Sequence, residues 1–245
     1  AISLAISEIT VTCKKYGIAA ASISRSHHFG QAGRHVERLA EQGLIGLMFG
    51  NTPKAIPPWG GSKPLFGTNP IAFSAPRAND APMVIDMSLS KVARGKVMLA
   101  NQQNEKIPEG WAIDAEGKPT TDPKKALAGA MLPIGDAKGS ALALMVEVLA
   151  AGLTGSNFGF EASSFLDAEG DSPGVGQLII AIDPSFFSGE SFGERTETIV
   201  GAILEQPGTR LPGDKRIEKR KAREKSEKIT ISKELHEKIS ILLKQ

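Results

Sequence analysis

Histidines, serines and basic residues stand in short loop motifs between expected strands and helices. The first motif, Ser-His-His-Phe-Gly at residues 26–30, precedes an expected helix. Free backbone N–H groups at a helix start can bind an anion, and a loop histidine there could donate to a phosphate or a carboxylate. A surface histidine pair, with Gly30 supplying a turn, is the other interpretation. The residue types alone leave both open.

The second motif, Ile-Asp-Met-Ser-Leu-Ser at residues 85–90, ends an expected strand. Ser88 and Ser90 stand at an expected helix start, where serine commonly caps free N–H groups. The same N–H groups could instead hold a phosphate, and Asp86 at the strand end could orient a polar ligand group. Capping and ligand binding both remain interpretations of this motif.

The third motif places Lys138 between Gly135 and Gly139 at the entry of an apolar helix. A cation at a helix N-terminus opposes the helix dipole, and a bound anion would remove that local cost. The alternative is a lysine whose stem lies along the surface while its ammonium reaches water. The sequence does not decide between them.

Two further motifs complete the set. Gly-Thr-Asn-Pro at residues 67–70 is typical of a turn, and Arg-Leu-Pro-Gly-Asp-Lys-Arg at 210–216 leads into a helix. Lys215 and Arg216 could hold a phosphate by charge, although helix capping and solvated charges are the alternative. Several of the five motifs offer groups that suit an anion. Together they indicate a nucleotide or small-acid site, with the loops converging on a single pocket.

Several common site types are absent from the sequence. No Gly-x-Gly-x-x-Gly follows an expected strand, and there is no Gly-x-x-x-x-Gly-Lys-Ser/Thr. Cys-x-x-Cys, His-Glu-x-x-His and Gly-x-Ser-x-Gly are also missing. A bound nucleotide would therefore not use the common fingerprints, and no metal site is predicted.

Hydrophobic periodicity predicts the elements that must position these motifs. Helices are expected at residues 2–15, 31–42, 90–103, 139–151, 194–204, 215–225 and 232–243, and strands at 18–24, 44–49, 71–75, 82–87 and 177–182. The helix at 139–151 is apolar nearly all round and is expected to be buried. Residues 50–70 form a long irregular loop of the kind that often carries function. Several connections are too short for crossover helices. The expected fold class is therefore α/β (α+β), with a mixed, largely antiparallel sheet flanked by helices.

The composition is that of an ordinary globular protein. The chain has 245 residues, of which 41% are hydrophobic and 23% charged. A single cysteine, Cys13, excludes an internal disulfide and indicates a reducing compartment, which we take to be the cytoplasm. The longest apolar run, residues 141–153, is too short to span a bilayer, so no membrane partner is expected.

Charge is distributed unevenly, although the net charge is only +2. Residues 210–245 hold 12 Lys and Arg against six Asp and Glu. Because this tail lacks interleaved aromatic residues for base stacking, it is interpreted as a solvated helix face, and no nucleic-acid partner is expected. The predicted organisation is a cofactor- and substrate-binding domain at 1–209, with a C-terminal helical tail at 210–245 that packs back on it.

Taken in order, the motifs resemble the malate/L-lactate dehydrogenase family of nicotinamide-dependent oxidoreductases. The match rests on residues 26–30, 67–70, 86–90, 107–111, 132–140, 149–155 and 210–216. The resemblance implies a mixed-sheet fold outside the Rossmann class, a homodimer, and NAD(P)H held by loops. The cofactor contacts that it implies are His28, Phe29, Gly30, Gln31, Ala32, Asp86, Met87, Ser88, Leu89, Ser90, Ala137, Lys138, Gly213, Asp214, Lys215 and Arg216. It also implies that Thr68 contacts the substrate. Ala137 stands where relatives often carry His, Trp or Tyr, which reduces its contact to the backbone.

The branch within this family is indicated by two sets of residues. Residues 149–155 and 210–216 are most similar to the Δ1-piperideine-2-carboxylate/Δ1-pyrroline-2-carboxylate reductases, whereas Arg94-Gly95-Lys96 is nearer the hydroxy-acid dehydrogenases. The family's proton-donor histidine belongs to an Asp-Ser-His-Gly-like motif in an N-terminal helical segment. None of the four histidines here matches that motif. We expect the segment to precede Ala1, and we assign no catalytic residue.

The resemblance therefore predicts NAD(P)H-dependent reduction of a cyclic imino acid or a small 2-oxo acid. NADPH is the preferred cofactor because of the basic pair Lys215-Arg216, with NADH as the other option. A malate/L-lactate (2-hydroxy acid) dehydrogenase is the first alternative. A nucleotide-binding module without catalysis and an interaction protein that uses the basic tail are the others.

Overall fold

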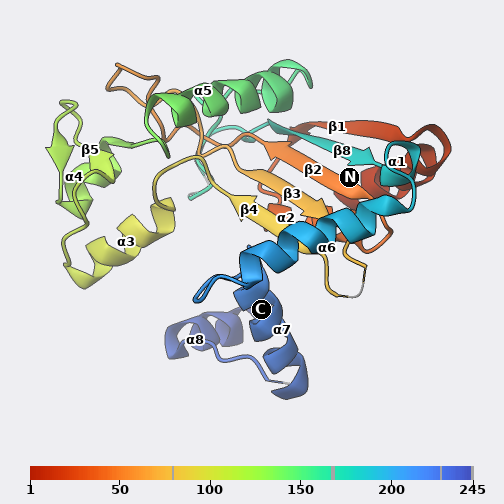
Figure 1. The fold of residues 1–245 in the computed structure, drawn as a ribbon. Helices are drawn as coiled ribbons and strands as arrows, with labels where there is room; N and C mark the ends of the chain where they lie inside the picture. Colours follow the sequence, from red (N-terminus) through yellow and green to blue (C-terminus); the bar gives the residue numbers. More distant parts are fainter. Residues whose placement is uncertain (79, 167–168, 227, 244–245) are drawn as a thin grey trace.

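A five-stranded antiparallel sheet forms the centre of the protein, in the order β1-β8-β2-β3-β4 (Figure 1). The structure is a computed structural model that describes residues 1–78, 80–166, 169–226 and 228–243. The strands are β1 (Ile18–Ser26), β2 (Ile45–Gly50), β3 (Ile71–Ala75), β4 (Met83–Met87) and β8 (Val175–Ile182). The predicted α/β (α+β) class is confirmed. Its sheet is antiparallel at every pairing rather than mixed, because β8 lies between β1 and β2 and runs opposite to both.

Alternating side chains of the central strands separate two hydrophobic cores, as the two-residue period of a strand requires. Met48 and Ile179 face one core, which α1 (Ile2–Tyr16) and α2 (Ala32–Ala40) complete. Phe49, which follows Met48 on β2, and Leu178, which precedes Ile179 on β8, face the other core. The helix α5 (Ala137–Val146) and the π-helix η1 (Glu147–Gly152) cover that second face.

The first helix follows its hydrophobic stripe closely. Ile6, Ile9 and Cys13 are buried, as the spacing predicts. Gly17 ends the helix with a φ of 84°, and its N–H donates to the carbonyl of Cys13. A residue with a side chain is strained in this left-handed conformation, so glycine suits the position.

A smaller lobe lies beyond β4 (Figure 1). It contains a three-stranded sheet of β5 (Ala112–Ile113), β6 (Pro119–Thr120) and β7 (Ala130–Met131), together with α3 (Arg94–Gln103) and α4 (Pro123–Ala128). The helix predicted from residue 90 begins instead at Arg94. The backbone before it is extended, since Ser90 pairs with Pro133 and the Lys91 N–H donates to the Leu132 carbonyl at 2.8 Å. Ser88 and Ser90 therefore do not cap a helix.

The apolar helix predicted at 139–151 differs from expectation in two ways. It changes from α to π geometry at Glu147, and only one of its faces is buried. Leu142, Leu144, Met145 and Val148 are exposed on the other face. The prediction of complete burial was wrong because a single helix on the outer layer of a sheet can bury only the side that contacts it.

Three helices follow the last strand: α6 (Ser191–Leu204), α7 (Asp214–Ser226) and α8 (Lys233–Leu242), with the 3-10 turn η2 (Pro184–Phe186) before them. The helices α7 and α8 protrude from the body at the chain's C-terminal end (Figure 1). Residues 227 and 244–245 of the predicted tail lie outside the described residues. Across the described ranges, no helix combines the length and apolarity needed to cross a membrane.

Candidate functional site

The larger of two hollows that contain predicted site residues has a volume of about 590 Å³ and is lined by segments between residues 28 and 166. We use the name larger hollow for the space lined by His28, Thr52, Pro53, Lys54, Ala55, Thr68, Arg94, Ala162, Ser164, Phe165 and Leu166. His28 follows β1, Thr52 and Lys54 follow β2, and Thr68 precedes β3. Loops next to the ends of β1, β2 and β3 therefore supply most of its polar lining.

Two threonines on this lining are held against each other. The Thr68 N–H donates to Thr52 Oγ1 at 2.9 Å, and the two hydroxyl oxygens lie 3.2 Å apart. The Thr52 N–H donates to Asn69 Oδ1 at 3.3 Å. These bonds fix both hydroxyl groups on one wall, where each retains capacity to bind a ligand.

Behind that wall, a buried carboxylate holds the loop in place. Glu147, only 3% exposed, accepts hydrogen bonds from four N–H groups. Its Oε1 accepts from the Gly67 N–H at 3.1 Å and from Asn69 Nδ2 at 2.9 Å. Its Oε2 accepts from Asn51 Nδ2 at 3.2 Å and from the Gly159 N–H at 3.1 Å. Glu147 thereby ties both ends of the 50–70 loop to the π-helix, and π-helical turns often occur beside functional sites.

A hydrogen bond determines which ring nitrogen of His28 can act as a donor. Its Nδ1 accepts the Gly30 N–H at 3.0 Å, so in the neutral ring the proton sits on Nε2. The ring packs edge-on against Phe165, with centroids 5.3 Å apart. His28 can thus offer one N–H donor at the hollow while its other nitrogen is engaged.

Two cations that line the larger hollow have no carboxylate partner among the described residues. In the described ranges, neither Lys54 nor Arg94 has an acidic side chain at ion-pair distance. Arg94 Nη2 donates to the Leu127 carbonyl at 3.2 Å, whereas its buried Nε has no hydrogen-bond partner among the described residues. Burial lowers the pKa of the Arg94 guanidinium. The hollow therefore has a net positive lining that an anion would complement.

A smaller hollow of about 400 Å³ forms where β4 meets the loop before α7. This name denotes the space lined by Val84, Ile85, Asp86, Met87, Arg210, Pro212, Gly213, Lys215 and Arg216. Gly213 has a φ of 93°, and a side chain there would approach the Val84 carbonyl to 2.9 Å. The loop can therefore approach the strand this closely only with glycine at that position.

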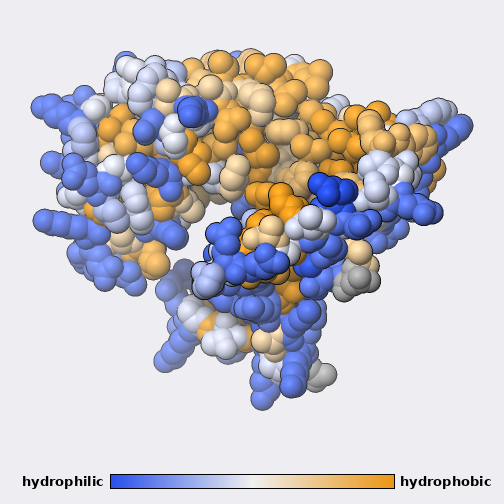
Figure 2. Space-filling view, viewed as in Figure 1, coloured by the Kyte–Doolittle hydropathy of each residue, from blue (hydrophilic) through white to orange (hydrophobic). Residues whose placement is uncertain are grey.

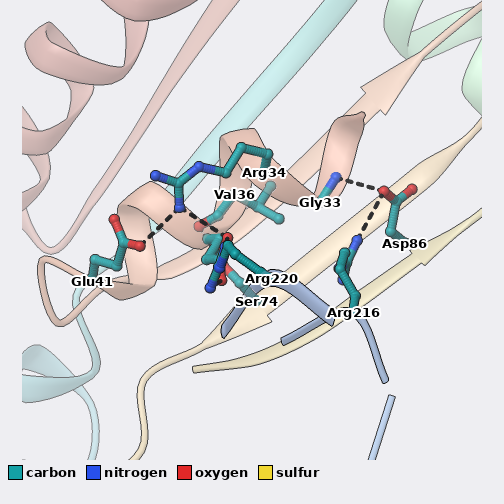
Figure 3. Close-up of polar contacts among 9 residues, drawn as sticks. Gly33, Arg34, Val36, Glu41, Ser74, Asp86, Arg216 and Arg220 are labelled. Atoms are coloured by element: carbon teal, nitrogen blue, oxygen red, sulfur yellow. Dashed lines mark hydrogen bonds and ion pairs between the residues drawn. The ribbon is translucent and has the colours of Figure 1, made fainter. Parts of the chain in front are cut away.

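Asp86 occupies the centre of the contacts around the smaller hollow (Figure 3). Its Oδ2 accepts the Gly33 N–H at 2.8 Å, in the first turn of α2, and lies 3.5 Å from Arg216 Nη1. A carboxylate near a helix N-terminus is favourable because it complements the helix dipole. Asp86 thus joins β4, α2 and α7.

A second ion-pair group attaches α7 to α2. Arg220 donates two hydrogen bonds to the Glu37 carboxylate, at 2.8 and 2.9 Å. Arg34 also donates to Glu37 and to Glu41, each at 2.9 Å. Hydrogen bonds from Arg220, then from Arg34, hold the pKa of the buried Glu37 carboxyl below its usual value. Two basic residues of the tail, Arg216 and Arg220, are therefore engaged within the chain.

The predicted site residues fall into three groups. His28 and Thr68 line the larger hollow, and Asp86, Met87, Gly213, Lys215 and Arg216 line the smaller one. Asp214 lies beside the latter and accepts the Leu211 N–H at 2.8 Å. The remaining predicted residues line neither hollow: Phe29, Gly30, Gln31, Ala32, Ser88, Leu89, Ser90, Ala137 and Lys138.

The structure thus divides these predicted residues between two hollows instead of the expected single pocket, and along the chain a closed segment follows β4. Leu89 is fully buried, its N–H donates to the Thr68 carbonyl at 2.8 Å, and its carbonyl accepts the Ile134 N–H at 2.8 Å. Asp86 and Met87 precede this closed segment and lie on the side of α7. Ser88 and Ser90 bond to each other through their hydroxyl groups at 2.7 Å. Lys138 is exposed in the first turn of α5.

Sequence reasoning gave no site role to three residues that the structure places at or behind the larger hollow. Lys54 gave no signal, since a loop lysine has no periodicity, and Arg94 entered only through the resemblance. Glu147 did carry a signal: it is an acidic residue inside an apolar run, which requires buried partners. In the part of the chain that the structure describes, no group of three or more His, Cys, Asp or Glu is arranged to hold a metal ion.

Comparison with known proteins places these features in a family. A family model described as malate/L-lactate dehydrogenase matches residues 1–240. A (2R)-3-sulfolactate dehydrogenase (NADP(+)) from Chromohalobacter salexigens is 56% identical over 226 residues, which are 92% of this chain and 68% of the relative. A Delta(1)-pyrroline-2-carboxylate/Delta(1)-piperideine-2-carboxylate reductase from Pseudomonas putida is 43% identical over 225 residues, 91% of this chain and 66% of the relative.

A solved structure has the same fold. The crystal structure of delta1-piperideine-2-carboxylate reductase from Pseudomonas syringae pvar. tomato aligns with a TM-score of 0.91 at 41% identity. The alignment covers 98% of this chain and 73% of that one. The chain spans about two thirds of the length of the curated relatives it matches.

Proposed function

The chain belongs to the malate/L-lactate dehydrogenase family, and we propose that it is an NADP-dependent oxidoreductase acting on a small 2-oxo acid or a cyclic imino acid. The observation that carries this proposal is the larger hollow, whose two cations have no carboxylate partner in the described ranges. A small carboxylate substrate would supply the missing negative charge. Relatives named for sulfolactate and for pyrroline and piperideine carboxylates support this substrate range.

The smaller hollow suits the phosphate groups of the cofactor. Arg210, Lys215 and Arg216 line it against a single acidic residue, Asp86, so basic groups are in excess. When bound, the nicotinamide cofactor supplies the hydride. The three basic side chains favour the phosphorylated cofactor, NADPH, over NADH, and the NADP(+) in one relative's name supports the same choice.

In the larger hollow, the substrate would meet hydrogen-bond donors and cations. Thr52 and Thr68 would bind its carboxylate through their hydroxyl groups, and His28 would donate its Nε2–H to the oxo or imino group. The guanidinium of Arg94, which has no acidic partner in the described ranges, would stabilise negative charge near the reacting carbon. These groups orient the substrate, which is the main contribution of the protein when a cofactor carries the chemistry.

The reverse direction, oxidation of a 2-hydroxy acid, is the second candidate. Arg94-Gly95-Lys96 favours it, because this run is nearer to the hydroxy-acid dehydrogenases. The same hollow would then hold the hydroxy acid, and His28 would face its hydroxyl group. The two directions share one site and differ in the substrate supplied.

A direct assay tests the proposal. The full chain is mixed with NADPH and, in turn, with Δ1-piperideine-2-carboxylate, pyruvate and oxaloacetate, and the loss of nicotinamide absorbance is followed. NADPH binding is measured in parallel by nicotinamide fluorescence. Turnover of at least one acid is expected. Cofactor binding without turnover of any acid in either direction would instead support a non-catalytic binding module.

The oligomeric state is a separate part of the proposal: we propose a homodimer formed through α5 and η1. Figure 2 shows apolar side chains gathered over α5, and Leu142, Leu144, Met145 and Val148 are exposed there. A continuous apolar face of this kind is typical of an interface. Light scattering should give twice the chain mass, and Val148→Glu should give the monomer mass. The single cysteine, Cys13, supports a cytoplasmic location.

A further inference from the structure

We propose that Lys54 makes the larger hollow selective for acids that carry a second anionic group, such as a dicarboxylate or a sulfonated 2-oxo acid. This inference rests on the proposed function, since it names the substrate class of the same site. It assigns Lys54 the role of a specificity-determining residue. The cyclic imino acids and pyruvate carry one negative charge and would not engage it.

The charge of the lining supports two anionic groups rather than one. Its described polar residues are His28, Thr52, Thr68 and Ser164, together with the cations Lys54 and Arg94, and no carboxylate is found among the described lining residues. A substrate with a single carboxylate would leave one cation without a counterion. A dianion would match both, and charge-assisted hydrogen bonds are about twice as strong as neutral ones.

The two cations are held differently, which separates their roles. Arg94 is partly buried and bonded to the Leu127 carbonyl, so its guanidinium is a fixed part of the wall. Lys54 is exposed, and its side chain has no hydrogen bond or ion pair to the described residues. An ammonium group on a flexible stem can reach a second anionic group at a range of distances. Arg94 would therefore provide a positive charge at a fixed position, and the flexible Lys54 side chain would contact the second anionic group of the substrate.

The backbone around Lys54 is nevertheless rigid. Its N–H donates to the Gly159 carbonyl at 2.8 Å, and the next N–H, of Ala55, donates to the Phe66 carbonyl at 2.7 Å. The Ala55 carbonyl accepts the Met131 N–H at 2.8 Å. The position of the Lys54 stem relative to Thr68, two residues after Phe66, is therefore set by the fold. A substitution at Lys54 can remove the ammonium without moving the wall.

The experiment compares Lys54→Met with two matched variants of the full chain. Lys63→Met removes an exposed lysine from the same 50–70 loop that does not line the hollow, and Lys54→Arg keeps the charge. For each, kcat/KM is measured with oxaloacetate and 3-sulfopyruvate as dianions, and with pyruvate and Δ1-piperideine-2-carboxylate as monoanions. The KM for NADPH is measured alongside, because a cofactor phosphate is the other anion that Lys54 could meet.

Lys54→Met should lower kcat/KM for the dianions about 10- to 100-fold, the range for loss of a hydrogen bond to a charged group. The kcat/KM for the monoanions and the KM for NADPH should change less than about threefold in this variant. For Lys63→Met every value should stay within the same limit, and for Lys54→Arg the kcat/KM for the dianions should do so. Equal losses for dianions and monoanions, an increase confined to the NADPH KM, or no change would each overturn the proposal.

A binding measurement keeps the inference testable apart from turnover. Titration calorimetry of the full chain with 3-sulfolactate, malate and lactate should give tighter binding of the two dianions, and Lys54→Met should abolish that preference. Failure of every acid in the turnover assay, with the preference intact, would reject the proposed reaction but support the role of Lys54. Equal binding of dianions and lactate in the unaltered chain would reject the role of Lys54.

Discussion

The two hollows differ in how their charges are balanced. In the smaller hollow, Asp86 lies 3.5 Å from Arg216 and also accepts a hydrogen bond from α2, so one basic group already has a partner. In the larger hollow, Lys54 and Arg94 have no acidic partner in the described ranges. The smaller hollow is thus built around a fixed network that a bound phosphate would extend. The larger one has a positive lining that a small anion would neutralise.

The supports behind the two hollows differ in the same way. Glu147, behind the larger hollow, accepts among the described residues only from neutral N–H groups, those of Asn51, Gly67, Asn69 and Gly159. Glu37, beside the smaller hollow, is paired with the guanidinium groups of Arg34 and Arg220. A carboxylate held by amides depends on its acceptor geometry, whereas one held by cations depends on its charge. The comparison therefore predicts different responses to substitution and to pH.

The largest effect is expected for Glu147→Gln. The variant replaces one acceptor oxygen by an NH2 group that faces N–H donors, and each buried donor left unsatisfied costs about 1–3 kcal/mol. We expect the free energy of unfolding to fall by about 3 kcal/mol. Thermal denaturation followed by circular dichroism measures this. Glu109→Gln, an exposed position in the small lobe, is the control and should leave the melting temperature unchanged.

The same variant also tests which hollow Glu147 supports. Because Glu147 binds the Gly67 N–H and Asn69 Nδ2, its substitution should raise the KM for the acid substrate and leave the KM for NADPH unchanged. Equal increases in both KM values would show that the two hollows are not independently supported.

Arg216→Ala should have the next largest effect, and on the smaller hollow alone. The substitution removes a cation and leaves the Asp86 carboxylate without its ion pair, so the remaining charge would repel a phosphate. We expect the KM for NADPH to rise about 10- to 100-fold, as for loss of a hydrogen bond to a charged group. The KM for NADH should rise by a smaller factor. Lys219→Ala, an exposed lysine on the same helix, should change neither value.

The acid response of Glu37 distinguishes the two supports further. Arg220 and Arg34 lower its pKa in the folded protein, so its contribution to stability is present above the ordinary Glu pKa and is lost as the pH falls. Stability should therefore decline below about pH 4.3, the ordinary value for Glu. Glu37→Gln should be less stable at neutral pH, by about 1.5 kcal/mol, and should show a shallower decline in acid. Parallel decline of the variant and the unaltered protein in pH-dependent melting would contradict this.

Helices and strands with a clear hydrophobic periodicity were predicted well from the sequence. The strand expected at residues 71–75 matches β3, and the stripe of Ile6, Ile9 and Cys13 is buried as expected. The family was also predicted correctly, from the order of the loop motifs. The small lobe was predicted less well, because its strands have two residues each and are too short for an alternation to be seen.

The site was predicted only in part, for a reason that lies in tertiary structure. The motifs that contain His28, Thr68, Asp86 and Lys215 do line hollows, as expected of loop residues next to strands. Between Met87 and the larger hollow the chain passes through the buried Leu89, whose bonds to Thr68 and Ile134 are tertiary contacts that no local pattern encodes. The position of Lys54 likewise follows from pairing between the segments around Ala55 and Phe66.

The smallest expected effect concerns Thr68→Val, which removes one neutral hydroxyl group from the larger hollow. The side chain keeps its shape, and the Thr68 N–H can still donate to Thr52 Oγ1, so the wall should remain in place. Loss of one hydrogen bond to the substrate carboxylate, which Thr52 also binds, should cost about 1.5 kcal/mol, the lower end for a bond to a charged group, and raise the KM for the acid about tenfold. Thr68→Ser keeps the hydroxyl and should restore most of the affinity. An effect of Thr68→Val on the NADPH KM instead would mean that Thr68 belongs functionally to the cofactor side, and the division of labour between the two hollows would have to be redrawn.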